Sequence, residues 1–283
     1  GYNLDKLIQE AAKGLDIDIH LDMMDVSVLN SMDSVIKYIV DTAARAESYR
    51  IMAFKGISEE EIKFIEDETL KILADDDISH ELQEKWLKIA VQVDYQALFK
   101  AMAEASRIMS PEVITAIKGI DVHSLQRRKD MPTDDVAGDV LDIIYTVMGK
   151  IIIGGTDKTI YKNDTFLIID FGGDDLYENN AGASTKENPI SIVIDFAGND
   201  RYLAKTNISQ GTGFMGIGIL MDIKGDDIYI SNKFSHGVGI FGGGMLLDME
   251  GDDRYIADSF VQGAGIFGIG MLIDKKGNVV EKI

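Results

Sequence analysis

The ten-residue stretch LMDIKGDDIY, residues 220–229, decides the fold of this chain, because close copies of it recur at nearly constant intervals. The other copies are IIDFGGDDLY at 168–177, VIDFAGNDRY at 193–202 and LLDMEGDDRY at 246–255. A fifth copy begins as LID at 272–274 and then loses the pattern. The first Asp of each copy follows the previous one by 25, 27, 26 and 26 residues. Repetition at such a period is the signature of a solenoid, whose coils stack neighbour on neighbour.

A glycine-rich stretch follows three of the copies and leaves room for further short strands in each coil. It reads QGTG at 210–213, HGVG at 236–239 and QGAG at 262–265, each before a second pair of glycines. This plan predicts a parallel β-helix, and the handedness of parallel crossovers favours a right-handed one. The glycines have two interpretations. They either form tight corners with positive φ, or they leave a bare wall that a helix, a partner or a polymer can approach closely.

Equivalent residues of neighbouring coils are expected to stack about 4.8 Å apart. Side chains alternate across a strand, so the column Ile168, Val193, Leu220, Leu246 and Leu272 is predicted to point into the coil, and its two flanking columns outward. The outward columns are apolar throughout: Leu167, Ile192, Ile219, Met245 and Met271, with Ile169, Ile194, Met221, Leu247 and Ile273. An apolar strip of this size should not face water. We therefore expect the helical half to cover it, with a second subunit as the alternative.

The first half of the chain is predicted to be helical, because glycine is scarce and apolar residues recur every three or four positions. The capping-box pattern of Ser58 and Glu61 begins one helix. A long helix is expected over His80–Met109, and Ser110 and Pro111 begin a short one. The linker that follows carries the basic cluster Arg127-Arg128-Lys129, which we interpret as a solvated loop.

The sequence thus predicts an α+β chain in three parts. A helical domain covers residues 1–133, a capping helix 134–150, and a solenoid of about five coils 151–283. The capping helix would cover the open end of the coil, whose strand edges otherwise invite aggregation. Its apolar stripe is formed by Val136, Val140, Ile143, Ile144 and Val147.

Composition narrows the function. A formal charge of −20 argues against nucleic acid as a partner, because phosphates would be repelled. The chain has no Cys, which excludes disulfides and zinc–thiolate sites and fits an extracytoplasmic protein, secreted or periplasmic. No apolar stretch is long enough to span a bilayer. A start at Gly1 without Met fits a processed chain whose signal peptide was removed.

The Gly-Asp/Asn-Asp-x-Tyr motif is the most distinctive chemical feature. Stacking would place like charges about 5 Å apart, where two of them repel by roughly 3 kcal/mol at an effective dielectric of about 20. Backbone N–H groups of the same turn could offset this repulsion. A cation is the alternative, and all-oxygen ligands point to Ca²⁺. The candidate ligands are Asp174, Asp175, Asp200, Asp226, Asp227, Asp252 and Asp253.

Gly198-Asn199-Asp200-Arg201-Tyr202 and its copies resemble half of the glycine- and aspartate-rich nonapeptide of RTX proteins, whose β-roll turns bind Ca²⁺ in ladders. The resemblance covers five residues per coil and implies Ca²⁺ as a cofactor. The chain departs from the RTX pattern in having one motif per longer repeat and incomplete glycines upstream of it. Whole repeats are also similar to uncharacterised secreted bacterial proteins with tandem Gly-Asp-Asp-x-Tyr coils, which implies no activity.

Two functions from different classes remain open. The first is a non-catalytic extracytoplasmic scaffold or binding module, stabilised by Ca²⁺, with a protein or glycan partner. It could also form homo-oligomers through the solenoid end or the outer apolar strip. The second is a carbohydrate-active enzyme of the β-helix type, a polysaccharide lyase or hydrolase. Its candidate residues are His236, which departs from a column of Gln210 and Gln262, with Arg201 and Arg254 two coils apart. A drifted repeat residue explains His236 equally well. The motif tyrosines are expected to form a buried stacked ladder and not a sugar-binding stripe.

Overall fold

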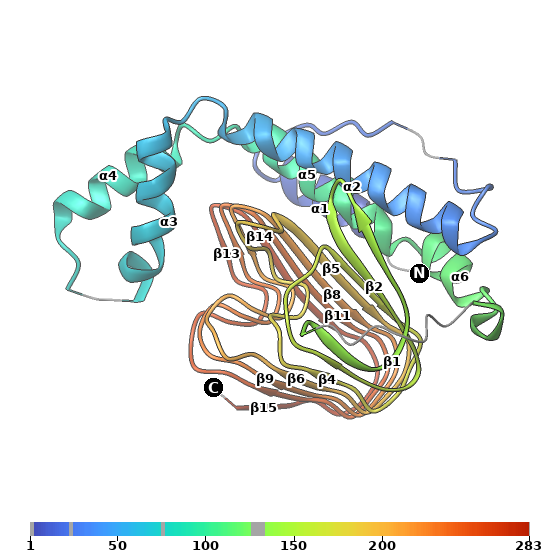
Figure 1. Cartoon of the computed structure of the whole chain (residues 1–283). Coiled ribbons are helices and arrows are strands. Elements are labelled where there is room, and N and C mark those ends of the chain that lie inside the picture. Colours follow the sequence, from blue (N-terminus) through green and yellow to red (C-terminus); the bar gives the residue numbers. More distant parts are fainter. Residues whose placement is uncertain (1–2, 23–24, 75–76, 126–133, 283) are drawn as a thin grey trace.

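The computed structural model describes residues 3–22, 25–74, 77–125 and 134–282, so the basic cluster at 127–129 lies outside the described residues. A helical region precedes a parallel β-solenoid, as the repeats predict (Figure 1). The solenoid has about four turns and not the five that the sequence predicted, because the fifth copy of the repeat loses the motif after Asp274. The α-helices are α1 (Leu4–Lys13), α2 (Met32–Phe54), α3 (Glu59–Ala74), α4 (His80–Ala90), α5 (Tyr95–Ser106) and α6 (Pro111–Lys118). Two short 3₁₀ helices follow α5 and α6, at Arg107–Met109 and Val122–Ser124.

Side-chain caps explain where most helices begin. The Ser58 hydroxyl accepts from the Glu61 backbone N–H at 3.4 Å, and Glu61 accepts from the Ser58 N–H at 3.0 Å, which confirms the predicted capping box. The helix over Pro111–Lys118 is also confirmed. The prediction of one helix over His80–Met109 is wrong, because α4 ends at Ala90 and α5 begins at Tyr95. There Asp94 caps a new helix, and the Tyr95 hydroxyl donates to the Ala90 carbonyl at 2.9 Å.

The prediction of a capping helix over 134–150 is also wrong. This segment forms an antiparallel hairpin of β1 (Val136–Thr146) and β2 (Gly149–Tyr161). Its apolar positions fit a helical stripe, but β-branched residues dominate them, and these favour strands. Gly138 and Gly149 adopt φ of 110° and 126°, which a helix would not allow. The hairpin covers the first end of the solenoid with a strand. One edge of β2 pairs with β1, and the other edge of β2 pairs with β3 and β4.

The later coils follow the predicted register. Leu220 of β8 pairs with Val193 of β5 on one side and with Leu246 of β11 on the other, and Leu246 pairs in turn with Leu272 of β14. The strands are β3 (Leu167–Asp170), β4 (Leu176–Tyr177), β5 (Ile190–Asp195), β6 (Arg201–Leu203), β7 (Gly213–Phe214), β8 (Ile217–Asp222), β9 (Ile228–Ile230), β10 (Gly239–Ile240), β11 (Gly243–Asp248), β12 (Arg254–Ile256), β13 (Gly265–Ile266), β14 (Ile269–Asp274) and β15 (Val280–Lys282). All pairs among β2–β15 are parallel, so the backbone coils upon itself.

Two apolar cores lie on either side of the long strands. The inner one joins the predicted inward column to a column of tyrosines. The outer one joins the predicted outward strip to the helices, which confirms that the helical half covers it. Helices α2 and α5 lie across β5, β8 and β11 in Figure 1. Trp86 of α4 contacts the rings of Phe241 and Phe267, with centroids 5.7 and 5.0 Å away. None of the described helices is long and apolar enough to cross a membrane.

The glycines of the coil have two roles, of which the corners with positive φ were expected and the close contact between coils was not. Gly211, Gly237 and Gly263 adopt φ of 71–75° at a corner of the coil. By contrast, Gly198 and Gly225 allow two coils to approach, because a Cβ on either would lie 1.7 Å from a glycine carbonyl oxygen of the preceding coil. Glycine is therefore required at both kinds of position, for different reasons.

Candidate cation site in the buried aspartate columns

Each of the first four repeats contributes two aspartates to the coil, and the fifth contributes one. The first, which we call the strand-end aspartates, are the last residues of the long strands: Asp170, Asp195, Asp222, Asp248 and Asp274. The second, which we call the turn aspartates, end the Gly-Asp/Asn-Asp part of each motif: Asp175, Asp200, Asp227 and Asp253. Apart from Asp274, all of these side chains are at most 1% exposed. This is a large concentration of carboxyl groups for the interior of a protein, so their contacts decide how it is tolerated.

Tyrosines of the neighbouring coil hold the strand-end aspartates. The Tyr177 hydroxyl donates to Asp195 at 2.6 Å, and the Tyr202 hydroxyl donates to Asp222 at 2.6 Å. The other Asp222 oxygen accepts a backbone N–H of its own turn, two residues further along. Five tyrosines stack with ring centroids 4.5–4.7 Å apart and are buried. This confirms the predicted ladder of Tyr177, Tyr202, Tyr229 and Tyr255 and adds Tyr161 at its start. Burial raises the pKa of Tyr202 well above its ordinary value, so it remains a donor.

Each turn aspartate accepts a hydrogen bond from the protein backbone with only one of its two carboxylate oxygens. Asp200 Oδ1 accepts the backbone N–H of Asp175, and Asp227 Oδ1 accepts that of Asp200, both at 2.6 Å. Among the described residues, no backbone N–H and no tyrosine, serine or threonine hydroxyl reaches Oδ2 of Asp175, Asp200, Asp227 or Asp253, and each of these oxygens is buried. Strand-end carboxyls lie close enough to share a proton with three of them: Asp170 with Asp175, Asp222 with Asp227, and Asp248 with Asp253. Each complete coil therefore contains one carboxylate oxygen that lacks a donor and faces the strand-end aspartates.

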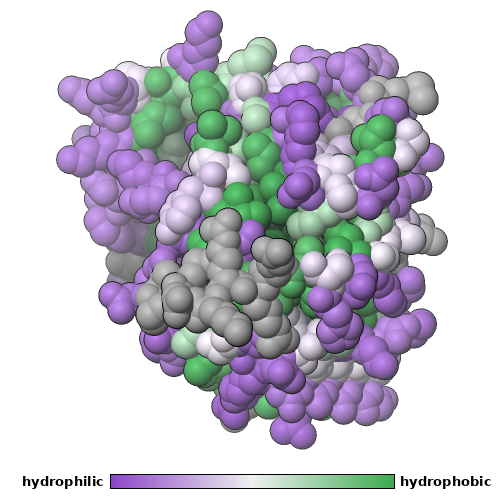
Figure 2. Space-filling model, turned by 45° about the vertical axis from the view of Figure 1, so that its right-hand side comes forward, coloured by the Kyte–Doolittle hydropathy of each residue, from purple (hydrophilic) through white to green (hydrophobic). Residues whose placement is uncertain are grey.

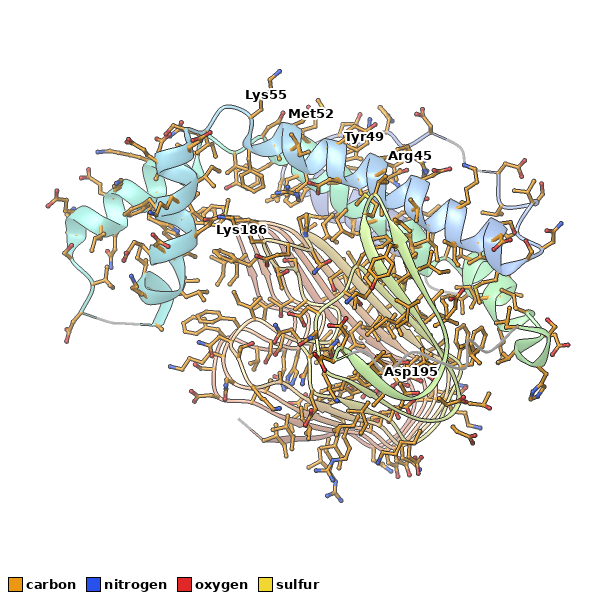
Figure 3. All side chains as sticks on the ribbon, in the orientation of Figure 1. Arg45, Tyr49, Met52, Lys55, Lys186 and Asp195 are labelled. Carbon is orange, nitrogen blue, oxygen red and sulfur yellow. The ribbon has the colours of Figure 1, made fainter. Side chains whose placement is uncertain are left out.

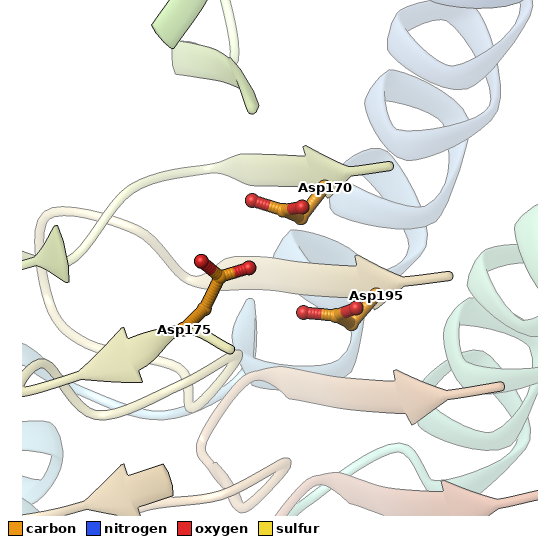
Figure 4. Close-up of side chains that lie close together, drawn as sticks. All are labelled: Asp170, Asp175 and Asp195. Carbon is orange, nitrogen blue, oxygen red and sulfur yellow. The ribbon is translucent and has the colours of Figure 1, made fainter. Parts of the chain in front are cut away.

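The two columns interlock into groups of three carboxylates. Asp175 extends from its turn toward Asp170 and Asp195, which end neighbouring strands (Figure 4). One oxygen from each of these three residues lies within 4.8 Å of the others, and the same holds for two further groups: Asp195, Asp200 and Asp222, and Asp227, Asp248 and Asp253. Asp195 thus belongs to two groups. It lies at a corner of the coils, well away from Lys55 and Lys186 on the helix-facing side (Figure 3).

Burial makes ionisation of these carboxyls costly. It raises the pKa of Asp200 to about 8, with a further contribution from the charge of Asp222, and it raises the pKa of Asp227 to about 11. The pKa of Asp175 is raised to about 6, again chiefly by burial. The columns cannot all be ionised without a countercharge, and either protons or cations can supply it.

The first Asp or Asn of each motif lies outside this arrangement. Asp174, Asn199, Asp226 and Asp252 are exposed. The Asn199 backbone N–H donates to Asp174 at 3.0 Å, and the Asp226 N–H donates to Asn199 at 2.9 Å. These side chains accept hydrogen bonds from the neighbouring coil. The prediction that backbone N–H groups of their own turn would bind them is therefore wrong at these positions. Of the predicted ligands, Asp175, Asp200, Asp227 and Asp253 therefore lie in the three buried carboxylate groups, and Asp174, Asp226 and Asp252 lie on the surface.

The candidate catalytic residues do not meet. His236 is fully buried inside the coil, where Nε2 lies 3.2 Å from the Ser231 hydroxyl, and burial lowers its pKa to about 4. Arg201 and Arg254 are exposed on the outer wall, because the tyrosine that follows each of them points inward. The wall of the solenoid separates the histidine from both arginines.

Sequence reasoning missed the strand-end aspartates as ligands, although they define the repeat. The available signal was that this position is Asp in all five copies, whereas the position after the motif glycine changes to Asn at Asn199 and Asn278. It also missed Tyr161, whose coil lacks the motif. Comparisons with protein-family models, curated proteins and solved structures find no match for this chain.

Proposed function

We propose that this chain is a non-catalytic, extracytoplasmic scaffold or binding module whose solenoid is stabilised by Ca²⁺ in the aspartate columns. The observation that carries the proposal is the row of buried turn-aspartate oxygens without a donor. A buried carboxylate oxygen left without a partner is costly, and a hard cation supplies the missing interaction.

The donor set favours Ca²⁺ over other ions. The three groups contain carboxylate oxygens alone, without His, and the chain has no Cys. Oxygens within 4.8 Å of one another fit around one ion, because two Ca²⁺–oxygen distances of roughly 2.4 Å span that length. Mg²⁺ usually keeps several waters, which suits a buried site less well. Protons shared between carboxyls, such as Asp175 and Asp170, are the competing countercharge.

The scaffold role is supported by the way in which the hairpin and the helices cover the solenoid. The hairpin closes one end of the solenoid, and the helices cover its apolar strip. Separation of His236 from Arg201 and Arg254 gives the carbohydrate-active alternative less support. An extracytoplasmic location is supported by a chain without Cys and by an acidic ladder suited to environments rich in Ca²⁺.

Calorimetric melting with Ca²⁺, Mg²⁺ or a chelator tests the proposal. Ca²⁺ at about 100 times its dissociation constant should stabilise the fold by about 2.7 kcal/mol per independent site, and Mg²⁺ should do so less. Asp200→Asn should reduce the Ca²⁺-dependent shift. Asp226→Asn is the matched control, because an Asn at the equivalent position of the preceding coil, Asn199, makes the same hydrogen bond. A melting midpoint that does not change with Ca²⁺ would remove the metal from the proposal.

A further inference from the structure

A groove separates α6 from the outer wall of the solenoid, on the side away from α3 and α4. Its volume is about 600 Å³, within the range of pockets that bury small molecules. Phe196, Met221 and Leu247 form its floor, and Pro111 and Ile114 of α6 line the opposite side. Figure 2 shows hydrophobic side chains gathered near the middle of this face between hydrophilic borders. The groove is apolar enough to hold a hydrocarbon chain.

The rim of the groove is basic although the chain as a whole is acidic. Its charged lining residues are Lys118, Lys224 and Lys275 against Glu250 alone, in a protein of net charge −20. Glu250 forms an ion pair with Lys276. Lys118 ends α6, and Lys224 and Lys275 lie in turns two coils apart, with Glu250 in the coil between them, so lysines from both sides line the groove.

Glu250 shows how a carboxylate responds at this rim. Lys276 has the largest effect in lowering the pKa of Glu250, and Lys224 and Lys118 lower it further. A second carboxylate placed at this edge would meet the same cations, and its attraction to them would be partly screened by water.

We propose that this groove binds a single-chain fatty acid, with the alkyl chain on the apolar floor and the carboxylate beside Lys118 and Lys224. The ligand follows from the pairing of an apolar floor with a cationic rim. A glycan would need many hydrogen-bonding groups where the floor is apolar. The site is separate from the aspartate columns, so the inference does not depend on Ca²⁺.

Isothermal titration of the whole chain with dodecanoate, below its micelle concentration, tests the site. The wild type should bind dodecanoate, and dodecanol should bind about tenfold more weakly because it lacks the charge. The double variant Lys118→Glu/Lys224→Glu should lose at least about tenfold in affinity. Lys55→Glu/Lys186→Glu, which makes the same charge change in a different groove, should retain it. No measurable dodecanoate binding, or equal loss in both double variants, would overturn the proposal.

Ile114→Trp separates a specific site from loose adsorption. The larger side chain should fill the groove and abolish binding of both dodecanoate and dodecanol, while the melting midpoint stays within a few degrees of wild type. Sedimentation of the wild type and of this variant tests the other occupant. A dimer that dissociates on Ile114→Trp, in a protein that binds no dodecanoate, would show that a second copy fills the groove and would contradict the fatty-acid assignment.

Discussion

At the residue scale, the coil interior is held by contacts that pass from one coil to the next. The Tyr202 hydroxyl reaches Asp222, and the Asp200 carboxylate reaches the Asp175 N–H. These bonds join residues 20 and 25 positions apart, so they exist only when the coils are in register. The aromatic and acidic columns therefore specify the same stacking.

Tyr202→Phe tests one such bond. The ring should keep its place in the ladder, but Asp222 would lose a buried donor, so the free energy of unfolding should fall by about 1–3 kcal/mol. Denaturant unfolding measures this change. Tyr145→Phe is the control, because Tyr145 is 74% exposed, and its effect should be within error of zero. Equal effects of the two substitutions would contradict the assigned role of Tyr202.

The pH dependence of the calcium-free protein follows from the raised carboxyl pKa values. The folded state holds protons on Asp222 to about pH 6 and on Asp248 to about pH 8, whereas unfolded Asp releases them near pH 4. This stabilisation is complete below the unfolded pKa and is lost as pH rises through the folded values. The midpoint in chelator should therefore fall between roughly pH 5 and 9, and Ca²⁺ should reduce the fall. A midpoint that rises over this range would contradict the account.

At the element scale, the turns fit together because glycine lets them touch. Gly225→Ala should cost about 3 kcal/mol or more, since its Cβ would lie 1.7 Å from the Gly198 carbonyl oxygen and the coils would have to separate. Gly56→Ala is the control, because a Cβ there meets nothing within 4 Å. Chemical denaturation compares the two. A Gly225→Ala protein as stable as Gly56→Ala would show that the coils do not pack this closely.

The elements also show how far sequence reasoning reaches. The period and the apolar columns predicted the register of Leu220 with Leu246, because a solenoid repeats one local solution. The hairpin at 136–161 could not be predicted in this way, since the first coil lacks the motif and its apolar spacing fits a helix as well as a strand. The turn aspartates were found, but the strand-end aspartates were not, because only the folded coil places the strand-end carboxyls within 4.8 Å of the turn carboxyls.

At the scale of the whole molecule, the helices and the solenoid share one core. Met102 of α5 packs close to Gly243 of β11, and the outer apolar strip belongs to the same cluster as the helices. We therefore expect helix and strand to unfold in one transition. Circular dichroism, which reports the helices, and near-ultraviolet absorption of the tyrosine ladder should give the same midpoint. Two separated midpoints would contradict a shared core.

The most direct test of the account is anomalous diffraction from crystals grown with Ca²⁺. We expect an anomalous peak from Ca²⁺ among Asp195, Asp200 and Asp222, with carboxylate oxygens at roughly 2.3–2.6 Å from the ion. Clear density without such a peak, and with paired carboxyl oxygens at roughly 2.5–2.7 Å from one another, would show that protons bridge the columns and would contradict it.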